Sequence, residues 1–309
     1  MFIAPRRADR PSDLATGTQA TAGRVAGCVF CAGNEDLTPP FRLRMPANLL
    51  LPWQARIIPN RFPFVEDLES AASAAGRPAL VRPAHGVHDV VIEAATHEAS
   101  ILGIEAAAWR DVWGMSQQRL AALATRSDLA WGTIFKNSGA LAGASLEHVH
   151  SQLVALDFVP PGLEAELAAL DGTPALFAHL LEWAAAQNCI VAKAGGLVAL
   201  VPPAPRQPLE TWIVTDTPED HFHATALARV EALADLTRLV VTRLQGVLPG
   251  AAYNWWLHQA PFATDSRGRW HWHLEILPRL ASFAGFELAT GCHVSTASPQ
   301  ESARLLRGG

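Results

Sequence analysis

Residues 148–152, which read HVHSQ, bring together the side chains best suited to chemistry at phosphorus. Alternate side chains of a strand point to the same face, so His148, His150 and Gln152 are expected to converge. The preceding loop, residues 143–145 (GAS), is small enough for its backbone N–H groups to approach a phosphate. A neutral imidazole beside such a loop is a good nucleophile for phosphorus. The competing interpretation is that both histidines are buried core residues with satisfied polar atoms.

Cysteine usage indicates a second chemical feature. The four cysteines are Cys28, Cys31, Cys189 and Cys292, and the N-terminus shows no signal peptide. A disulfide scaffold is therefore not expected, and the Cys28-x-x-Cys31 pair indicates metal binding or redox chemistry. Redox chemistry would need a thioredoxin-like βαβ context, which is missing here. Twelve histidines make metal binding the favoured interpretation.

Composition limits the class of protein. The chain has 309 residues, which predicts two domains or one duplicated domain at about 150 residues each. Only 17% of the residues are charged and 50% are hydrophobic, which excludes disorder over most of the chain. The net charge of −5 offers no basic field for nucleic acid or a membrane surface, so a small-molecule partner is expected. Without an apolar run of about 18 residues, we expect a soluble cytoplasmic protein.

Hydrophobic periodicity predicts the elements that position these residues. Residues 1–45 lack periodicity and are expected to form an extended arm. In the first half we predict strands at 56–59, 89–93, 131–136 and 148–154, with a helix at 104–126. A helix over 163–186 links the halves. In the second half we predict strands at 210–214, 252–257 and 271–275 and a helix at 225–247. Residues 298–301 (SPQE) form a capping box that opens a last helix through Arg307.

The second half repeats the element order of the first half. Each half contains a strand, a helix and two strands, and each ends in a His-x-His pair, at His148 and His150 and at His271 and His273. Nearly equal numbers of residues separate the first strand of each unit from its histidine pair. This repetition predicts a duplicated module of the α+β class.

Several motifs occur in a characteristic order along nearly the whole chain. They are residues 4–11 (APRRADRP), 28–35 (CVFCAGNE), 59–63 (PNRFP), 137–152, 258–262 (HQAPF), the His271 and His273 pair, and 285–287 (GFE). With these motifs the chain resembles the galactose-1-phosphate uridylyltransferase family, the transferase branch of the histidine-triad superfamily. The resemblance implies a duplicated histidine-triad-like module, with an antiparallel sheet, helices packed on it, and domains at 1–160 and 161–309.

The resemblance also implies a reaction. His150 takes the place of the family nucleophile, which attacks the α-phosphorus of a nucleotide sugar and releases sugar 1-phosphate. A nucleotidyl-histidine forms, and a hexose 1-phosphate then reverses the step. Gln152 stands where the related hydrolases have a histidine, and an amide cannot protonate a leaving group. A sugar phosphate leaves as a stable anion without a general acid, while Gln152 can donate a hydrogen bond to a phosphate oxygen.

Two metal sites are implied by the same resemblance. The family zinc site maps to Cys28, Cys31, His97 and His148, a closed set typical of structural zinc. From the residues alone, His85 and His88 compete with His97. A second metal, zinc or iron, maps to Glu166, His258, His271 and His273, although Glu166 is also consistent with a solvated helix residue. Cys189 and His221 are alternatively remnants of a repeated first site.

Substrate contacts are the last expectation from the resemblance. Asn60 is expected near the base, and Asn137, Gly143 and Ser145 near the phosphates. Arg7 and Arg10 match family arginines at the substrate or at the interface of a homodimer, and Glu287 matches a substrate-binding residue. Residues 285–292 are as similar to plant-type ADP-glucose phosphorylases, and His293 stands where galactose-handling members have glutamine. The alternatives are therefore a nucleotide-sugar phosphorylase and a non-catalytic zinc-stabilised nucleotide-binding protein.

Overall fold

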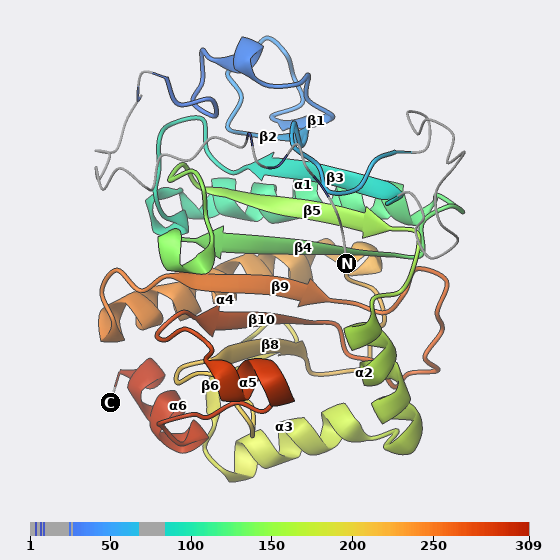
Figure 1. Cartoon of the computed structure of the whole chain (residues 1–309), viewed down its shortest axis with the longest axis vertical. Helices are drawn as coiled ribbons and strands as arrows, with labels where there is room; N and C mark the ends of the chain where they lie inside the picture. Colours follow the sequence, from blue (N-terminus) through green and yellow to red (C-terminus); the bar gives the residue numbers. More distant parts are fainter. Residues whose placement is uncertain are drawn as a thin grey trace.

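Ten strands form one sheet in the computed structural model, which describes Ala4, Arg7, Asp9, Val25, residues 27–67 and residues 84–308 (Figure 1). The strands are β1 (Leu43–Met45), β2 (Ala55–Pro59), β3 (Gly86–Ile92), β4 (Trp131–Ser138), β5 (His150–Leu156), β6 (Ile190–Ala194), β7 (Leu197–Leu200), β8 (Thr211–Thr215), β9 (Tyr253–His258) and β10 (His273–Pro278). The helices are α1 (Ala106–Ala124), α2 (Pro161–Gly172), α3 (Leu176–Ala186), α4 (Leu227–Val247), α5 (Gly285–Thr290) and α6 (Pro299–Arg307).

The order of the strands shows the internal repeat. It runs β1-β2-β3-β5-β4-β9-β10-β8-β7-β6, and neighbouring strands pair antiparallel. The unit β3-α1-β4-β5 corresponds to the unit β8-α4-β9-β10, and β4 meets β9 at the centre of the sheet. The α+β fold and the duplicated element order are therefore confirmed. Both units share one sheet, and a domain boundary between residues 160 and 161 stays a prediction.

The two faces of the sheet have different surroundings. Helices α1 and α4 pack against each other and cover one face (Figure 1). Leu153 and Ala155 of β5 belong to the main core, which also contains Trp109 of α1. Because side chains alternate along a strand, His150 and Gln152 point to the opposite face. The helices therefore bury one face and leave the other face of β5 available for a site.

Several expected boundaries are wrong, each for a local reason. The helix expected over 163–186 is two helices, α2 and α3, because Pro174 cannot continue a helix and Thr173 before it is held in a non-helical conformation, with φ −140°. Residues 1–45 were expected to form an extended arm, but in the described part of this segment Leu43–Met45 form strand β1, which pairs with β2. Strands β6 and β7, and helix α5, were not predicted. The last helix is confirmed, since Ser298 Oγ accepts a hydrogen bond from Glu301 N at 3.2 Å.

No helix in the described ranges combines the length and apolar character needed to cross a membrane.

A buried ion pair fastens β5 to its neighbours. Lys136 on β4 and Glu93 after β3 are 2% and 1% exposed. Lys136 Nζ donates to Glu93 Oε2 at 2.5 Å and to the backbone O of His150 at 2.8 Å. Ser151 Oγ donates to the other oxygen of Glu93. Burial lowers the pKa of Lys136, while the Glu93 carboxylate opposes that shift. The pair thus connects three chain segments directly beneath His150.

Removing one partner of this pair should be costly. In Lys136→Met, Glu93 becomes a buried charge without its counter-ion, so we expect the free energy of unfolding to fall by about 3–5 kcal/mol. Urea unfolding of the purified protein measures this loss. Arg110→Met, which breaks the exposed Arg110–Asp235 pair, is the matched control and should unfold close to wild type. Equal losses of unfolding free energy in the two variants would contradict a stabilising role for the buried Lys136–Glu93 pair.

Candidate active site and zinc centre

The backbone just before β5 fixes the imidazole of His150, the first residue of that strand. Its Nδ1 lies 2.8 Å from the carbonyl O of His148, and a carbonyl can only accept. Nδ1 therefore carries the proton, and Nε2 keeps the lone pair needed to attack phosphorus. Phe30 packs edge-on against the His150 ring, with centroids 5.3 Å apart. The side chain is only 6% exposed, so its orientation is set before any substrate arrives.

His150 and Gln152 line a cavity of about 270 Å³, near the lower end of the usual range for small-molecule sites. Both apolar and polar side chains form its wall. The lining comprises Val29, Phe30, Leu37, Thr38, Pro39, Ile58, Asn60, Arg61, Phe62, Val90, Ser145, Leu146, His150 and Gln152. Ser145 Oγ is buried there without a hydrogen-bond partner among the described residues. A phosphate oxygen would satisfy this hydroxyl.

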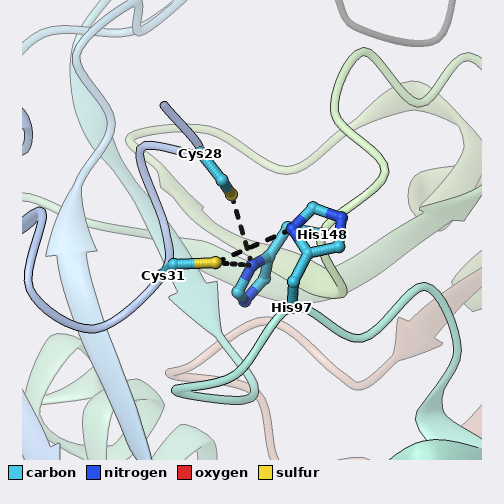
Figure 2. A group of neighbouring side chains, drawn as sticks. All are labelled: Cys28, Cys31, His97 and His148. Carbon is cyan, nitrogen blue, oxygen red and sulfur yellow. Dashed lines mark hydrogen bonds between the residues drawn. The ribbon is translucent and has the colours of Figure 1, made fainter. Parts of the chain in front are cut away.

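Four potential metal ligands meet beside this cavity (Figure 2). Cys28 Sγ lies 3.4 Å from His148 Nδ1, and Cys31 Sγ lies 3.6 Å from His148 Nδ1 and 3.7 Å from His97 Nδ1. Tetrahedral zinc, with bonds of about 2.3 Å to sulfur and 2.0–2.1 Å to nitrogen, places sulfur and nitrogen about 3.6 Å apart. The four donors therefore fit zinc, with no position left open for substrate.

The surroundings of these ligands also fit a metal. His148 Nε2 donates to the carbonyl of Ala94 at 3.0 Å, which leaves Nδ1 unprotonated toward the sulfurs. Burial lowers the pKa of His148 to about 4, so the ring is neutral, as a ligand must be. Burial raises the pKa of Cys28 to about 11. The Cys28 thiolate therefore needs a nearby cation to form at neutral pH, and zinc would supply it.

The histidines that compete for the third zinc position lie elsewhere. His85 Nε2 is 2.8 Å from Asp128 Oδ2, and His88 Nε2 is 2.9 Å from Gln152 Oε1. Of these three candidates, His97 is the one that lies beside Cys31. Among the described residues, Cys189 and His221 do not join a group of metal ligands; Cys189 Sγ contacts the Gln187 carbonyl and His221 Nε2 the Pro261 carbonyl.

The residues expected to bind substrate are only partly assembled. Asn60 and Ser145 line the cavity. Asn137 Oδ1 accepts a hydrogen bond from Asn254 Nδ2 at 2.7 Å and does not line it. Gly143 has φ +81°, and a Cβ there would meet nothing within 4 Å, so backbone conformation alone explains this glycine.

The remaining three expected residues are Arg7, Arg10 and Glu287, and neither Arg7 nor Glu287 is among the described residues that line the cavity. Arg7 Nη1 donates to the carbonyl of Phe62, a cavity residue, at 3.1 Å. Arg10 lies outside the described residues. Glu287 lies on the exposed helix α5, where it accepts from Ala284 N, and it does not line the cavity.

Three of the four residues expected to hold a second metal converge in the second half. Glu166, His258 and His273 offer ligand atoms within 4.8 Å of one another. His271 is not in that group, and its Nδ1 lies 2.6 Å from the carbonyl of Thr215. The complete four-residue set is therefore not assembled, and a second metal stays a prediction. Glu275, which was not expected, places Oε1 3.3 Å from His258 Nε2.

Ion pairing explains much of this second cluster without a metal. Burial opposes charge on His258, but Glu275 and Glu166 outweigh burial and raise the pKa of His258. Burial likewise works against the charged Glu275, yet His258 and Arg206 help to lower its pKa to about 2. The two carboxylates therefore favour positive charge on His258. The sequence signal for Glu275 was available, since it follows His273 as Gln152 follows His150.

Comparison with known proteins decides the family. Residues 47–160 match the family model "galactose-1-phosphate uridyl transferase, N-terminal domain", and residues 109–306 match a domain of unknown function, DUF4921. An ADP-glucose phosphorylase of Arabidopsis thaliana is 30% identical over 317 residues, covering 99% of this chain and 89% of that protein. The chain belongs to the galactose-1-phosphate uridylyltransferase family.

Two further relatives agree with this membership. The crystal structure of an ADP-glucose phosphorylase from Arabidopsis thaliana with bound ADP-glucose is similar with a TM-score of 0.82 and 29% identity, covering 99% of this chain and 94% of that chain. A galactose-1-phosphate uridylyltransferase of Thermotoga maritima is 24% identical, covering 72% of this chain and 74% of that protein. The family thus supports an enzyme that is either a nucleotidylyltransferase or a nucleotide-sugar phosphorylase.

We predict about one tightly bound zinc per chain at the first cluster. Cys28→Ser removes a ligand, so it should lose zinc and lower the melting temperature, because binding of structural zinc contributes to folding. Metal analysis of protein purified without added metal, together with thermal unfolding, measures both effects. Cys189→Ser changes a buried cysteine outside the cluster and should keep its zinc. Unchanged zinc content and melting in Cys28→Ser would contradict the site.

Proposed function

We propose that this protein transfers a nucleoside monophosphate from a nucleotide sugar to a phosphate-bearing acceptor through a covalent adduct on His150. The observation that carries the proposal is the hydrogen bond from His150 Nδ1 to the His148 carbonyl. It leaves Nε2 as the nucleophilic nitrogen in a cavity that also contains Gln152 and the unpartnered hydroxyl of Ser145. Family membership supports the same reaction class.

The reaction proceeds in two balanced steps. His150 Nε2 attacks the α-phosphorus, an N–P bond forms, and the bond to the bridging oxygen breaks. Sugar 1-phosphate leaves with that electron pair as an anion, so no proton donor is needed. A phosphate oxygen of the acceptor then attacks the same phosphorus and breaks the N–P bond. Gln152 donates a hydrogen bond to a non-bridging oxygen, where negative charge builds up during both steps.

Inorganic phosphate is the acceptor we propose first. The supporting observation is the similarity to an ADP-glucose phosphorylase over 99% of the chain. A hexose 1-phosphate is the second candidate, supported by the match of residues 47–160 to the uridylyltransferase family model and by the Thermotoga relative. The two activities share the chemistry of the first step and differ in the nucleotide sugar used and in the molecule that attacks the adduct.

Zinc is proposed as a structural ion in this mechanism. Cys28, Cys31, His97 and His148 would hold it, and when bound it supplies charge compensation for the two thiolates. By joining these four ligands, the ion would connect residues 28–31 to the segment at the start of β5. Phe30, which packs on His150, would thereby be held in place.

A homodimer is proposed as the working form. Glu287 does not line the cavity of its own chain, and its neighbours Phe286 and Leu288 are 57% and 77% exposed. An exposed apolar segment of this kind is typical of a surface that another protein covers. We propose that a second copy receives helix α5, so that Glu287 serves the partner's site.

The covalent step predicts a detectable adduct. Protein incubated with ADP-glucose or UDP-glucose should gain the mass of one nucleoside monophosphate, lose it in acid, and show ping-pong kinetics. His150→Gly should lose transfer by roughly 10⁴-fold or more while folding normally, because the zinc ligands are other residues. Intact-protein mass spectrometry and initial-rate kinetics measure these effects. If a panel of nucleotide sugars never labels the wild-type protein, the non-catalytic binding interpretation takes its place.

The acceptor is settled by product analysis. With ADP-glucose and phosphate, the proposed phosphorylase should form ADP and glucose 1-phosphate. Isotope-labelled phosphate should enter the β-position of ADP, because the phosphate attacks the adduct. A parallel reaction with galactose 1-phosphate in place of phosphate tests the uridylyltransferase activity. Faster turnover with UDP-glucose and galactose 1-phosphate would reject phosphorolysis in favour of the uridylyltransferase.

A further inference from the structure

His88 lies buried beside Gln152, on the neighbouring strand β3. It is 4% exposed. In the antiparallel register Val90 is opposite Gln152 and His88 is opposite Val154, so His88 and Gln152 are diagonal neighbours on one face of the sheet. His88 Nε2 lies 2.9 Å from Gln152 Oε1. His88 thus contacts the oxygen of the Gln152 amide and not its NH₂ group.

Two backbone N–H groups assign the hydrogen bonds, because backbone groups cannot flip. Phe64 N donates to His88 Nδ1 at 3.4 Å, which leaves the imidazole proton on Nε2. Phe62 N donates to Asn60 Oδ1 at 2.8 Å, so Asn60 presents its NH₂ group, 3.0 Å from His88 Nε2. With the proton on Nε2, the Asn60 NH₂ group cannot hydrogen-bond to that nitrogen, because both groups are donors. Gln152 Oε1, at 2.9 Å, is the side-chain atom there that accepts the Nε2 proton.

The direction of this hydrogen bond decides what Gln152 offers to the cavity. With Oε1 held by His88, the NH₂ group is the end of the amide left to face substrate. The opposite orientation would place a partly negative oxygen against a phosphate. We propose that His88 is a positioning residue, which holds Gln152 as a hydrogen-bond donor to the transferred phosphoryl group. This inference rests on the proposed function.

The internal repeat gives an independent comparison. Glu210 on the β8 side and Glu275 on β10 occupy the positions of His88 and Gln152, and Arg206 donates to both carboxylates. A carboxylate cannot donate to phosphate.

The equivalent of His150 is also blocked in that half. His273 stacks between Trp212 and His258, with centroids 5.4 and 4.7 Å away. The His88–Gln152 pair is therefore present in the half that has the cavity. In the other half, where stacked rings surround the equivalent of His150, two glutamates take its place.

A double-mutant cycle tests the proposal by the rate of adduct formation in a single turnover with ADP-glucose. Gln152→Ala should slow adduct formation by roughly 10²-fold, as expected for loss of one transition-state donor. His88→Phe keeps a buried ring but removes the donor, and should slow it by roughly 10- to 100-fold with little change in KM. The double variant should be no slower than Gln152→Ala, because His88 acts through Gln152.

Two further variants separate positioning from a general effect on folding. His88→Gln restores an N–H donor near Oε1 and should recover most of the lost rate. His85→Phe is the matched control: it replaces another buried histidine of the same half, 5% exposed and bonded to Asp128. It should leave the rate of adduct formation near wild type, whatever its effect on the melting temperature.

The outcomes distinguish this proposal from the proposed function. If wild type never forms the adduct, the proposed function fails. If wild type forms it but the two losses multiply in the double variant, or His88→Phe reacts at the wild-type rate, positioning by His88 is wrong. Should His88→Phe not fold, nitrogen-15 NMR of histidine-labelled wild type still decides. The proposal requires the Nε2–H tautomer of His88, and an Nδ1–H tautomer would overturn it.

Discussion

The hydrogen bond from His150 Nδ1 to the carbonyl of His148 connects the two parts of the first-half site. His148 presents Nδ1 to the cysteine sulfurs, and its backbone oxygen fixes the tautomer of the residue two positions later. His148 lies in the segment that leads into β5 and His150 is the first residue of that strand, so the first ring serves the metal cluster and the second ring the cavity. Any shift of β5 relative to residues 28–31 would disturb both functions together.

The sheet explains why this short segment is held so well. β5 lies between β3 and β4, and the Lys136–Glu93 pair reaches the His150 carbonyl from below. Leu153 packs into the core beneath α1 on one face while His150 faces the cavity on the other. The geometry of His150 is therefore set by the central strands rather than by a loop, as the pre-organisation of the proposed active site requires.

Much of this architecture could be predicted from the sequence, because it depends on local period and on repetition. Alternation located β5, and the repeated His-x-His pair revealed the duplication. Local signals that could have improved the prediction were present: Pro174 ends α2, and Gly195-Gly196 marks the turn between β6 and β7. The place of His88 beside Gln152 depends on how β3 registers with β5, and the Glu275 network depends on Arg206 reaching across the sheet. The strand register of His88 and the reach of Arg206 have no signature in sequence spacing, although the position of Glu275 two residues after His273 does.

The two halves show how one scaffold supports different interiors. The first half keeps an imidazole, an amide and a hydroxyl around a cavity. The second half fills the corresponding place with stacked rings and a network of Glu166, His258, Glu275 and Arg206. A satisfied ion-pair network of this kind leaves no attacking nitrogen exposed to a nucleotide. Duplication thus retained the sheet while the side chains at matching positions diverged.

The most direct test of the account is the position of the phosphorus on the imidazole of His150. Protein labelled with a nucleotide sugar can be digested at neutral pH, and the labelled peptide can be examined by phosphorus-31 NMR against synthetic standards. Because Nδ1 is bound to the His148 carbonyl, the account predicts a single adduct at Nε2 of His150. An adduct at Nδ1, or on any histidine other than His150, would contradict it.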